Sequence, residues 1–262
     1  MPLSQHDKAV RFRQLHEGPD AFVFPNPWDA GSARALAKLG FQALATSSGA
    51  SAAVLGRRDG ELSRDEALAH ARAIVAATDL PVAADLENGF GDAPEDAALT
   101  IRLAAEAGVV GGSIEDASIE KAGPRYDIGQ AAERIAAAAE AARALPFPFT
   151  LTARTENYLR GHDDLDDTIK RLQAFEQAGA DVLFAPGLPS LDAVRAICAA
   201  VNKPVNYMIG IPGRSFSVAE LQAAGVRRIS LATSLYRAAM AGLMQAAREI
   251  KEQGTFSYVD RP

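Results

Sequence analysis

Acidic side chains stand at the ends of two neighbouring apolar segments of this sequence. Asp85 and Glu87 close one segment, and Glu115 closes the next, with Asp116 expected to alternate onto the opposite face. Carboxylates gathered in one place repel one another unless a cation joins them or they take up protons. Oxygen ligands suit a hard ion, so Asp85, Glu87 and Glu115 are predicted to hold Mg2+, or alternatively Mn2+. The competing interpretation is that these acids cap helices or pair with arginines.

A basic side chain follows the next apolar segment along the chain. Arg154 comes directly after Thr150–Ala153 and precedes Glu156. A guanidinium there can bind a substrate carboxylate through two parallel hydrogen bonds. It can also form a structural salt bridge with Glu115 or Glu156, and the two roles are compatible.

Small residues follow the second apolar segment. Ser48, Gly49 and Ala50 allow backbone N–H groups to approach a ligand closely and form an anion-binding nest, with an ordinary Ser-Gly turn as the alternative interpretation. Asp59, further along, adds an acid that can reach the outer shell of a metal. An ordinary exposed turn explains the position of Asp59 nearly as well.

The connection after Glu115 is long enough to form a lid. It runs from Ala117 to Asp127 and contains Lys121, Arg125 and Tyr126 but no cysteine or histidine. Long loops at the mouth of a site often close over substrate. Lys121 and Tyr126 are therefore candidate catalytic groups, with Tyr126 a possible proton donor.

Eight short apolar runs must position these residues. Ala-rich helical segments separate the runs, and several of those segments end in glycine, which is the pattern of βα units with a parallel sheet. Eight such units predict an α/β fold, a (β/α)8 TIM-type barrel forming a single domain over residues 1–262. A helix at Ser4–Leu15 is expected before it and a helical extension, Ser234–Glu252, after it. The runs are Ala21–Phe24, Ala43–Thr46, Val82–Leu86, Gly112–Glu115, Thr150–Ala153, Val182–Ala185, Val205–Ile209 and Arg228–Ala232.

Bulk properties exclude several classes of function. The net charge is −6 and no basic run exceeds two residues, which argues against nucleic-acid binding. No segment is apolar enough for a membrane span, and the polar N-terminus lacks a secretory signal. A lone Cys198, within a helical run, fits a reducing compartment, so a cytoplasmic location is expected. His6, His16 and His70 lie on helices away from the strand ends and His162 begins the helix after the fifth run, and all four are predicted to be surface or capping residues.

Four segments resemble motifs of the isocitrate lyase and phosphoenolpyruvate mutase superfamily. They are Ser48-Gly49-Ala50 with Gly56-Arg57-Arg58-Asp59, Asp85-Leu86-Glu87-Asn88-Gly89-Phe90-Gly91, Ser113-Ile114-Glu115-Asp116 and Ala153-Arg154-Thr155-Glu156. The resemblance implies that Asp85 ligates Mg2+ directly, while Glu87, Glu115 and Asp59 hold its waters. It implies that the Ser48–Ala50 amides and Arg154 bind the substrate carboxylate or developing oxyanion. It also implies a homo-oligomer, often a tetramer that exchanges its C-terminal helix.

The chain departs from this family in the lid. Glu120-Lys121-Ala122-Gly123-Pro124-Arg125 replaces both the lyase motif Lys-x-Cys-Gly-His and the mutase motif Lys-Thr-Asn-Ser. The resemblance therefore implies a lyase-type enzyme that cleaves or decarboxylates a small 2-oxo or 2-hydroxy dicarboxylate through a metal-stabilised enolpyruvate. Two alternatives remain open: a P–C bond enzyme of the phosphonopyruvate hydrolase or phosphonomutase type, and a non-catalytic barrel that binds metal and carboxylate.

Overall fold

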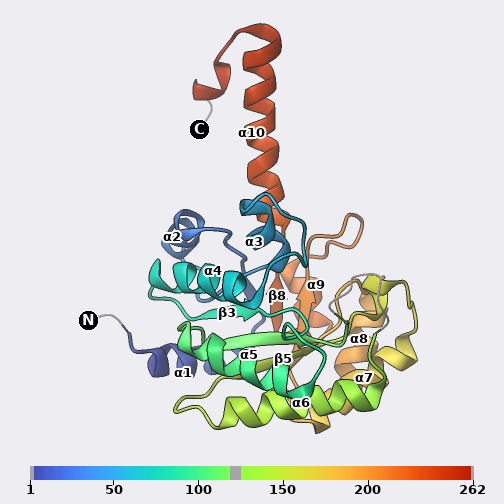
Figure 1. Ribbon diagram of the computed structural model, residues 1–262. Coiled ribbons are helices and arrows are strands. Elements are labelled where there is room, and N and C mark those ends of the chain that lie inside the picture. The colour runs from blue at the N-terminus through green and yellow to red at the C-terminus, as the bar shows by residue number, and fades with distance from the viewer. Residues whose placement is uncertain (1–2, 119–124, 261–262) are drawn as a thin grey trace.

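Parallel strands form a nearly closed barrel at the centre of the molecule (Figure 1). The structure is a computed structural model that describes residues 3–118 and 125–260. In these residues the eight strands pair in the order β1-β8-β7-β6-β5-β4-β3-β2. The strands are β1 (Phe22–Phe24), β2 (Leu44–Ala45), β3 (Val82–Asp85), β4 (Gly111–Glu115), β5 (Thr150–Arg154), β6 (Val182–Phe184), β7 (Val205–Met208) and β8 (Arg228–Ser230).

Asn26, just after β1, links the segments that follow β2 and β8 and so helps to close the barrel. Its side-chain amide donates to the Thr46 carbonyl at 2.9 Å, and its oxygen accepts from the Leu231 N–H at 2.8 Å. The Ala45 N–H also donates to the Pro25 carbonyl at 3.0 Å. These bonds join β2 and β8 to the end of β1, so the predicted (β/α)8 barrel is confirmed.

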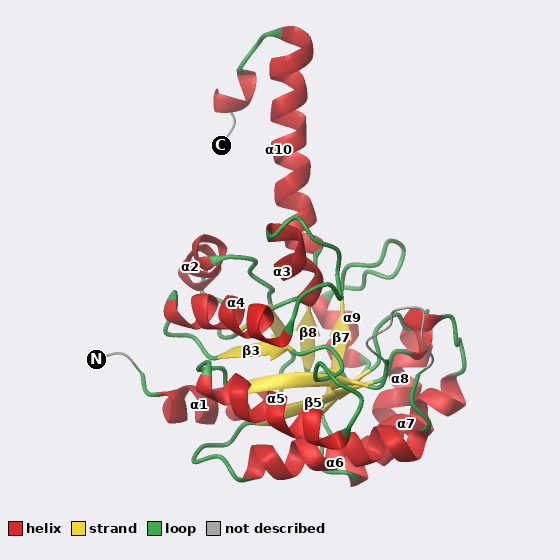
Figure 2. Ribbon diagram, viewed as in Figure 1, coloured by secondary structure: helices red, strands yellow, loops and turns green. Residues whose placement is uncertain are grey.

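Helices surround the sheet, and the sequence sets where they begin and end (Figure 2). Ser4 caps α1 with a reciprocal Asp7 contact, and Gly40, directly after α2, adopts a φ of 91°. The helices are α1 (Gln5–Glu17), α2 (Ala30–Lys38), α3 (Ser48–Val54), α4 (Arg64–Ala76), α5 (Pro94–Glu106), α6 (Ile128–Arg143), α7 (Leu165–Gln177), α8 (Leu191–Ala200), α9 (Val218–Ala223) and α10 (Ser234–Gln253), with 3₁₀ turns at Asn157–Arg160 and Ser257–Asp260.

The barrel is packed at its N-terminal end and open at the other. Phe12 of α1 is fully buried and packs against Phe24. The absence of a side chain at Gly111 makes space for the Phe12 ring, because a Cβ atom at position 111 would lie only 3.0 Å from that ring. Above them the interior carries small residues such as Ala45 and Ala83. A cavity therefore remains near the carboxyl ends of the strands, where the candidate site was predicted.

The last helix leaves the body of the barrel (Figure 1). α10 spans almost the predicted range, and much of its surface is exposed, including Leu243 and Met244. The last predicted strand, by contrast, ends early, because Ala232 takes a positive φ of 46°. Among the helices of the described residues, none has the length and apolar character needed to cross a membrane.

Candidate active site

Arg154 lies at the centre of a carboxylate cluster at the strand ends. The β4–β5 register places Glu115 beside Arg154, and the Arg154 Nε lies 3.4 Å from Glu115 Oε2. The same Nε donates to Glu156 Oε1 at 2.5 Å, while Nη1 lies 3.8 Å from Asp85 Oδ2. The Arg154 guanidinium also packs over the Phe184 ring at 5.3 Å. Side chains from the ends of β3, β4 and β5 thus bring one guanidinium and three carboxyl groups together.

Burial makes the charges of this cluster interdependent. Loss of water raises the pKa of Glu115, and the neighbouring Glu156 carboxylate raises it further, against the opposing effect of Arg154. Burial alone would lower the pKa of Arg154, but Glu156, Glu115 and Asp85 outweigh it, so that pKa rises. Arg154 therefore stays charged and holds the carboxylates together.

Asp85 is the acidic group most directly presented to the cavity. Its carboxylate accepts hydrogen bonds from the Ser48 N–H at 3.2 Å and the Glu87 N–H at 3.3 Å, and its own N–H donates to the Thr46 hydroxyl. The Glu87 carbonyl in turn accepts from the Glu115 N–H at 2.9 Å. Backbone contacts thus bring the predicted metal residues of β3 and β4 into one layer.

The donor set suits an ion that keeps most of its waters. Among the described residues, no group of three or more acidic, histidine or cysteine side chains forms a ready-made metal cage. Mg2+ commonly uses one or two carboxylates and retains several waters, so such a cage is not required. Asp85 still has acceptor capacity after its two amide contacts, which fits direct binding with Glu115 and Glu87 acting through water.

The small residues after β2 form the first turn of α3, which lies beside Asp85. The Ser48 N–H contacts Asp85, whereas the Ala50 N–H is directed at the Ser47 hydroxyl at 3.4 Å, and Ala50 is fully buried. A side chain at Gly49 would come 3.4 Å from the Asp59 carboxyl carbon, so Asp59 lies against this helical turn. The structure therefore brings Ser48, Gly49 and Asp59 to the same side of the cavity mouth.

Of the two predicted lid catalysts, Lys121 and Tyr126, the structure describes only Tyr126. Lys121 lies outside the described residues. Tyr126 is buried, and its hydroxyl donates to Asp92 at 2.6 Å and accepts from the Asn88 amide at 3.0 Å. Burial, together with the Asp92 hydrogen bond, raises the pKa of Tyr126 to about 12. Tyr126 is not among the residues that line the cavity, so a proton transfer from it does not match this arrangement.

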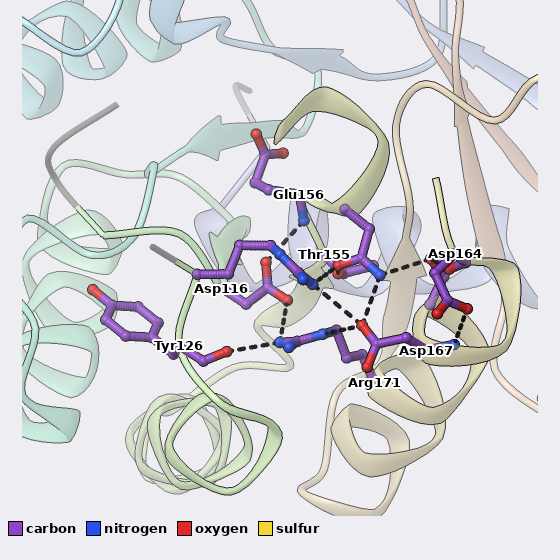
Figure 3. Close-up of polar contacts among 10 residues, drawn as sticks. Asp116, Tyr126, Thr155, Glu156, Asp164, Asp167 and Arg171 are labelled. Atoms are coloured by element: carbon purple, nitrogen blue, oxygen red, sulfur yellow. Dashed lines mark hydrogen bonds and ion pairs between the residues drawn. The ribbon is translucent and has the colours of Figure 1, made fainter. Parts of the chain in front are cut away.

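Behind the site, a buried network supports Glu156 (Figure 3). Asp116 accepts a hydrogen bond from the Glu156 N–H at 2.8 Å and one from Arg171 Nη1 at 3.0 Å. Arg171 also donates to the Tyr126 carbonyl at 2.9 Å and to Asp167 at 2.8 Å. Asp116 thus faces away from the metal residues, as its place in the strand predicted, and ties β5 to α7.

Glu156 was predicted only as a salt-bridge partner of Arg154, and no prediction covered the residues of the cavity floor. Glu156 stands two residues after Arg154 and is 5% exposed, so alternation along the chain was the available signal. The floor is lined by Asn206, Arg228 and Ser230, which were read only as members of apolar runs. A charged residue opening the last predicted strand, Arg228, was the overlooked signal.

Comparison with known proteins agrees with this geometry. A family model described as phosphoenolpyruvate phosphomutase matches residues 12–251. A solved candidate lyase/mutase from Burkholderia cenocepacia J2315 is 55% identical, with a TM-score of 0.96 over 98% of this chain and 92% of that one. A 2,3-dimethylmalate lyase is 29% identical, with a TM-score of 0.87 over 95% and 89% of the two chains.

A sequence relative points the same way. The 2-methylisocitrate lyase of Escherichia coli strain K12 is 30% identical over an alignment that covers 97% of this chain and 88% of that enzyme. The described fold, the strand-end carboxylates and these matches lead to one conclusion. The chain belongs to the phosphoenolpyruvate mutase family, within the phosphoenolpyruvate mutase/isocitrate lyase superfamily.

Proposed function

We propose that this protein is a Mg2+-dependent lyase that cleaves a C–C bond in, or decarboxylates, a small 2-oxo or 2-hydroxy dicarboxylate through an enolpyruvate intermediate. The observation that carries this proposal is the burial of Arg154 among the carboxylates of Asp85, Glu115 and Glu156 at the cavity. A fixed cation beside potential metal ligands suits a dicarboxylate whose charge shifts towards an oxygen during reaction.

Each residue has a specific part in this proposal. Asp85 would hold Mg2+ directly, with Glu87, Glu115 and Asp59 acting through water. Bound Mg2+, or Mn2+ in its place, would supply Lewis-acid polarisation of the substrate's oxo group.

Arg154 would bind a substrate carboxylate. Its Nε is occupied by Glu156, whereas within residues 3–118 and 125–260 the nearest acid to its terminal nitrogens is Asp85, at a long 3.8 Å. The terminal nitrogens are therefore available to pair with a second carboxylate in the parallel geometry that arginine favours. The Gly49 backbone N–H would complete the binding of that carboxylate from the other side of the cavity, because the Ser48 N–H already donates to Asp85.

Decarboxylation needs no protonated leaving group, so it suits a lid without the lyase cysteine. The enolate that remains must still gain a proton, from water or from a lid residue. Lys121 stays the candidate for that step. Tyr126, engaged with Asp92 and Asn88, is assigned instead to holding the end of the lid connection.

The decisive experiment measures pyruvate release from oxaloacetate, methylisocitrate, 2,3-dimethylmalate and phosphonopyruvate, each with Mg2+ and with a chelator. Turnover of a C–C substrate that disappears with chelator is the expected result. Turnover that persists after exhaustive chelation would overturn the metal assignment. No turnover of any substrate, with stabilisation by oxalate and Mg2+, would instead favour a binding barrel without catalysis.

A second candidate is P–C bond chemistry, because the matching family model is described as a phosphomutase. Arg125 lies near the lid but donates to Asn157 and, at 3.2 Å, to Asp167, so it is committed to the protein. The Arg125 guanidinium is therefore not available to bind a phosphonate group. Phosphate release from phosphonopyruvate, faster than turnover of the carboxylate substrates, would favour this candidate.

We further propose that the protein assembles as a homo-oligomer, a tetramer by resemblance. The projecting α10 exposes Leu243, Met244 and Ile250, and a second copy of the chain would cover these apolar side chains. The small-molecule carboxylate remains the partner expected at the cavity.

A further inference from the structure

A buried guanidinium lies inside the barrel, below the strand-end carboxylates. Arg228 opens β8 and is 4% exposed. Its Nε donates to Asn206 Oδ1 at 2.8 Å, its Nη2 donates to the Thr152 hydroxyl at 2.9 Å, and its Nη1 lies 3.4 Å from His16 Nε2. The guanidinium also packs over the Phe24 ring at 4.9 Å. Every one of these contacts is with an uncharged group.

His16 is uncharged because of where it lies. Its Nδ1 is 2.8 Å from the Phe12 carbonyl, so Nδ1 must donate and Nε2 is left to accept from Arg228. Burial, reinforced by the Arg228 charge, lowers the pKa of His16 to about 3. The prediction of a surface or capping role for this histidine was therefore wrong: His16 is 7% exposed and supports the barrel floor.

Arg228 and Arg154 thus differ in how their charges are balanced. Arg154 is surrounded by carboxylates, whereas no carboxylate in residues 3–118 or 125–260 forms an ion pair with Arg228. Both line the same cavity. Thr152, which accepts from Arg228, precedes Arg154 by two residues on β5, a separation of about 7 Å along a strand. The unbalanced charge therefore lies about one layer of side chains beneath Arg154.

A buried charge without an ionic partner is costly, and an apolar side chain of similar volume would pack the same space. The cost is offset when a negative ligand enters the cavity above. Asp85 is the acid that lines the cavity, and Glu115 and Glu156 pack behind it around Arg154, so a second fixed cation adds to the attraction that Arg154 and bound Mg2+ would exert on a dianionic ligand.

We propose that Arg228 is a positioning residue whose unbalanced charge, fixed below the cavity, raises the affinity of the site for dianionic carboxylates without contacting them. For the class of substrate, this inference rests on the function proposed above. The attraction acts on bound substrate and transition state alike, so it should lower KM and leave kcat nearly unchanged. A single charge at this depth should change affinity on the order of tenfold.

The test is calorimetric titration of oxalate, in the presence of Mg2+, into the wild type, Arg228→Met and Arg228→Lys at pH 7.5. His16→Gln is the matched control, because it alters a contact of Arg228 but keeps the charge. Arg228→Met should bind oxalate on the order of tenfold more weakly. Arg228→Lys should stay within about threefold of the wild type, and His16→Gln should match it. Circular dichroism confirms folding, and Arg228→Gln replaces Arg228→Met if the latter does not fold.

Two results would overturn the inference. One is wild-type oxalate affinity in a folded Arg228→Met or Arg228→Gln variant. The other is an equal loss in Arg228→Met and Arg228→Lys, which would indicate that hydrogen-bond geometry matters and charge does not. On any substrate that the wild type turns over, KM should rise about tenfold in Arg228→Met and kcat should change less than about threefold. If the wild type turns over none, the proposed function fails, while the oxalate titration still decides the role of Arg228.

Discussion

The Nε of Arg154 and the Oε1 of Glu156 are 2.5 Å apart, in a pair that is almost fully shielded from water. This contact fixes the direction in which the guanidinium presents its terminal nitrogens. Asp116 fixes Glu156 in turn, through the Glu156 backbone N–H. The orientation of the proposed substrate-binding arginine therefore depends on two residues that need not touch substrate.

Glu156→Gln should lower kcat/KM about tenfold, because a hydrogen bond to Arg154 survives but its ionic strengthening is lost. Glu156→Ala should cost on the order of a hundredfold, since the guanidinium loses its anchor as well. Arg154→Ala should abolish turnover. Steady-state pyruvate release measures all three, with the exposed Glu140→Gln as control. Wild-type kinetics in a folded Glu156→Ala variant would show that the anchor is dispensable.

Asp85→Ala should abolish Mg2+-dependent turnover and weaken binding of Mn2+, read by electron paramagnetic resonance, at least about tenfold. The reason is that Asp85 is the carboxylate proposed to bind the ion directly. Asp192→Ala removes an exposed acid on α8 and should change neither measurement. Cys198→Ser should also change little. Full activity in a well-folded Asp85→Ala variant would remove the basis of the metal assignment.

Arg171→Met should destabilise the protein by about 3–5 kcal/mol, because it leaves Asp116 buried without its charge partner. The measurement is chemical denaturation with urea. Arg195→Met breaks the exposed pair with Asp192 and should cost less than about 1 kcal/mol. Equal losses in the two variants would contradict the assignment of Asp116 and Arg171 as a structural pair.

The predicted and observed sites differ for physical reasons. Asp85, Glu115 and Arg154 follow apolar runs, and in parallel strands such residues must meet at one edge, so the sequence predicted their grouping. Tyr126 was misplaced because a loop sequence does not specify where a side chain finds partners. Those partners, Asp92 and Asn88, come from the turn after β3.

Arg228 and His16 illustrate a second limit. They are 212 residues apart, and only closure of the barrel over α1 brings them together. Neither the periodicity of apolar residues nor a local sequence motif predicts a contact between residues so far apart in the chain. The fold was predictable because each βα unit repeats a local pattern, whereas the cavity floor depends on contacts between the first helix and the last strand.

His16 should make the stability of the protein depend on pH. Its folded pKa of about 3 lies below the ordinary value of 6.5, so between these values the unfolded chain binds more protons. Stability from this group is complete above about pH 6.5 and falls as the pH drops towards 3, by at most about 1.4 kcal/mol per unit. Denaturation of His16→Gln should show a flatter pH dependence than the wild type. The exposed His6→Gln should not, and an unchanged slope in His16→Gln would contradict the neutral state assigned to His16.

Leu243→Glu combined with Met244→Glu should shift the protein from a homo-oligomer to a smaller species in light scattering coupled to size exclusion. These side chains are 57% and 48% exposed on α10, and burying each large apolar side chain against a second copy would contribute about 1.5–3 kcal/mol. Charged side chains there would oppose the association. Val218→Glu, which alters an apolar side chain of α9 that is 43% exposed, should leave the mass unchanged. A monomeric wild type would refute the proposed assembly, and an equal shift in Val218→Glu would place the interface elsewhere.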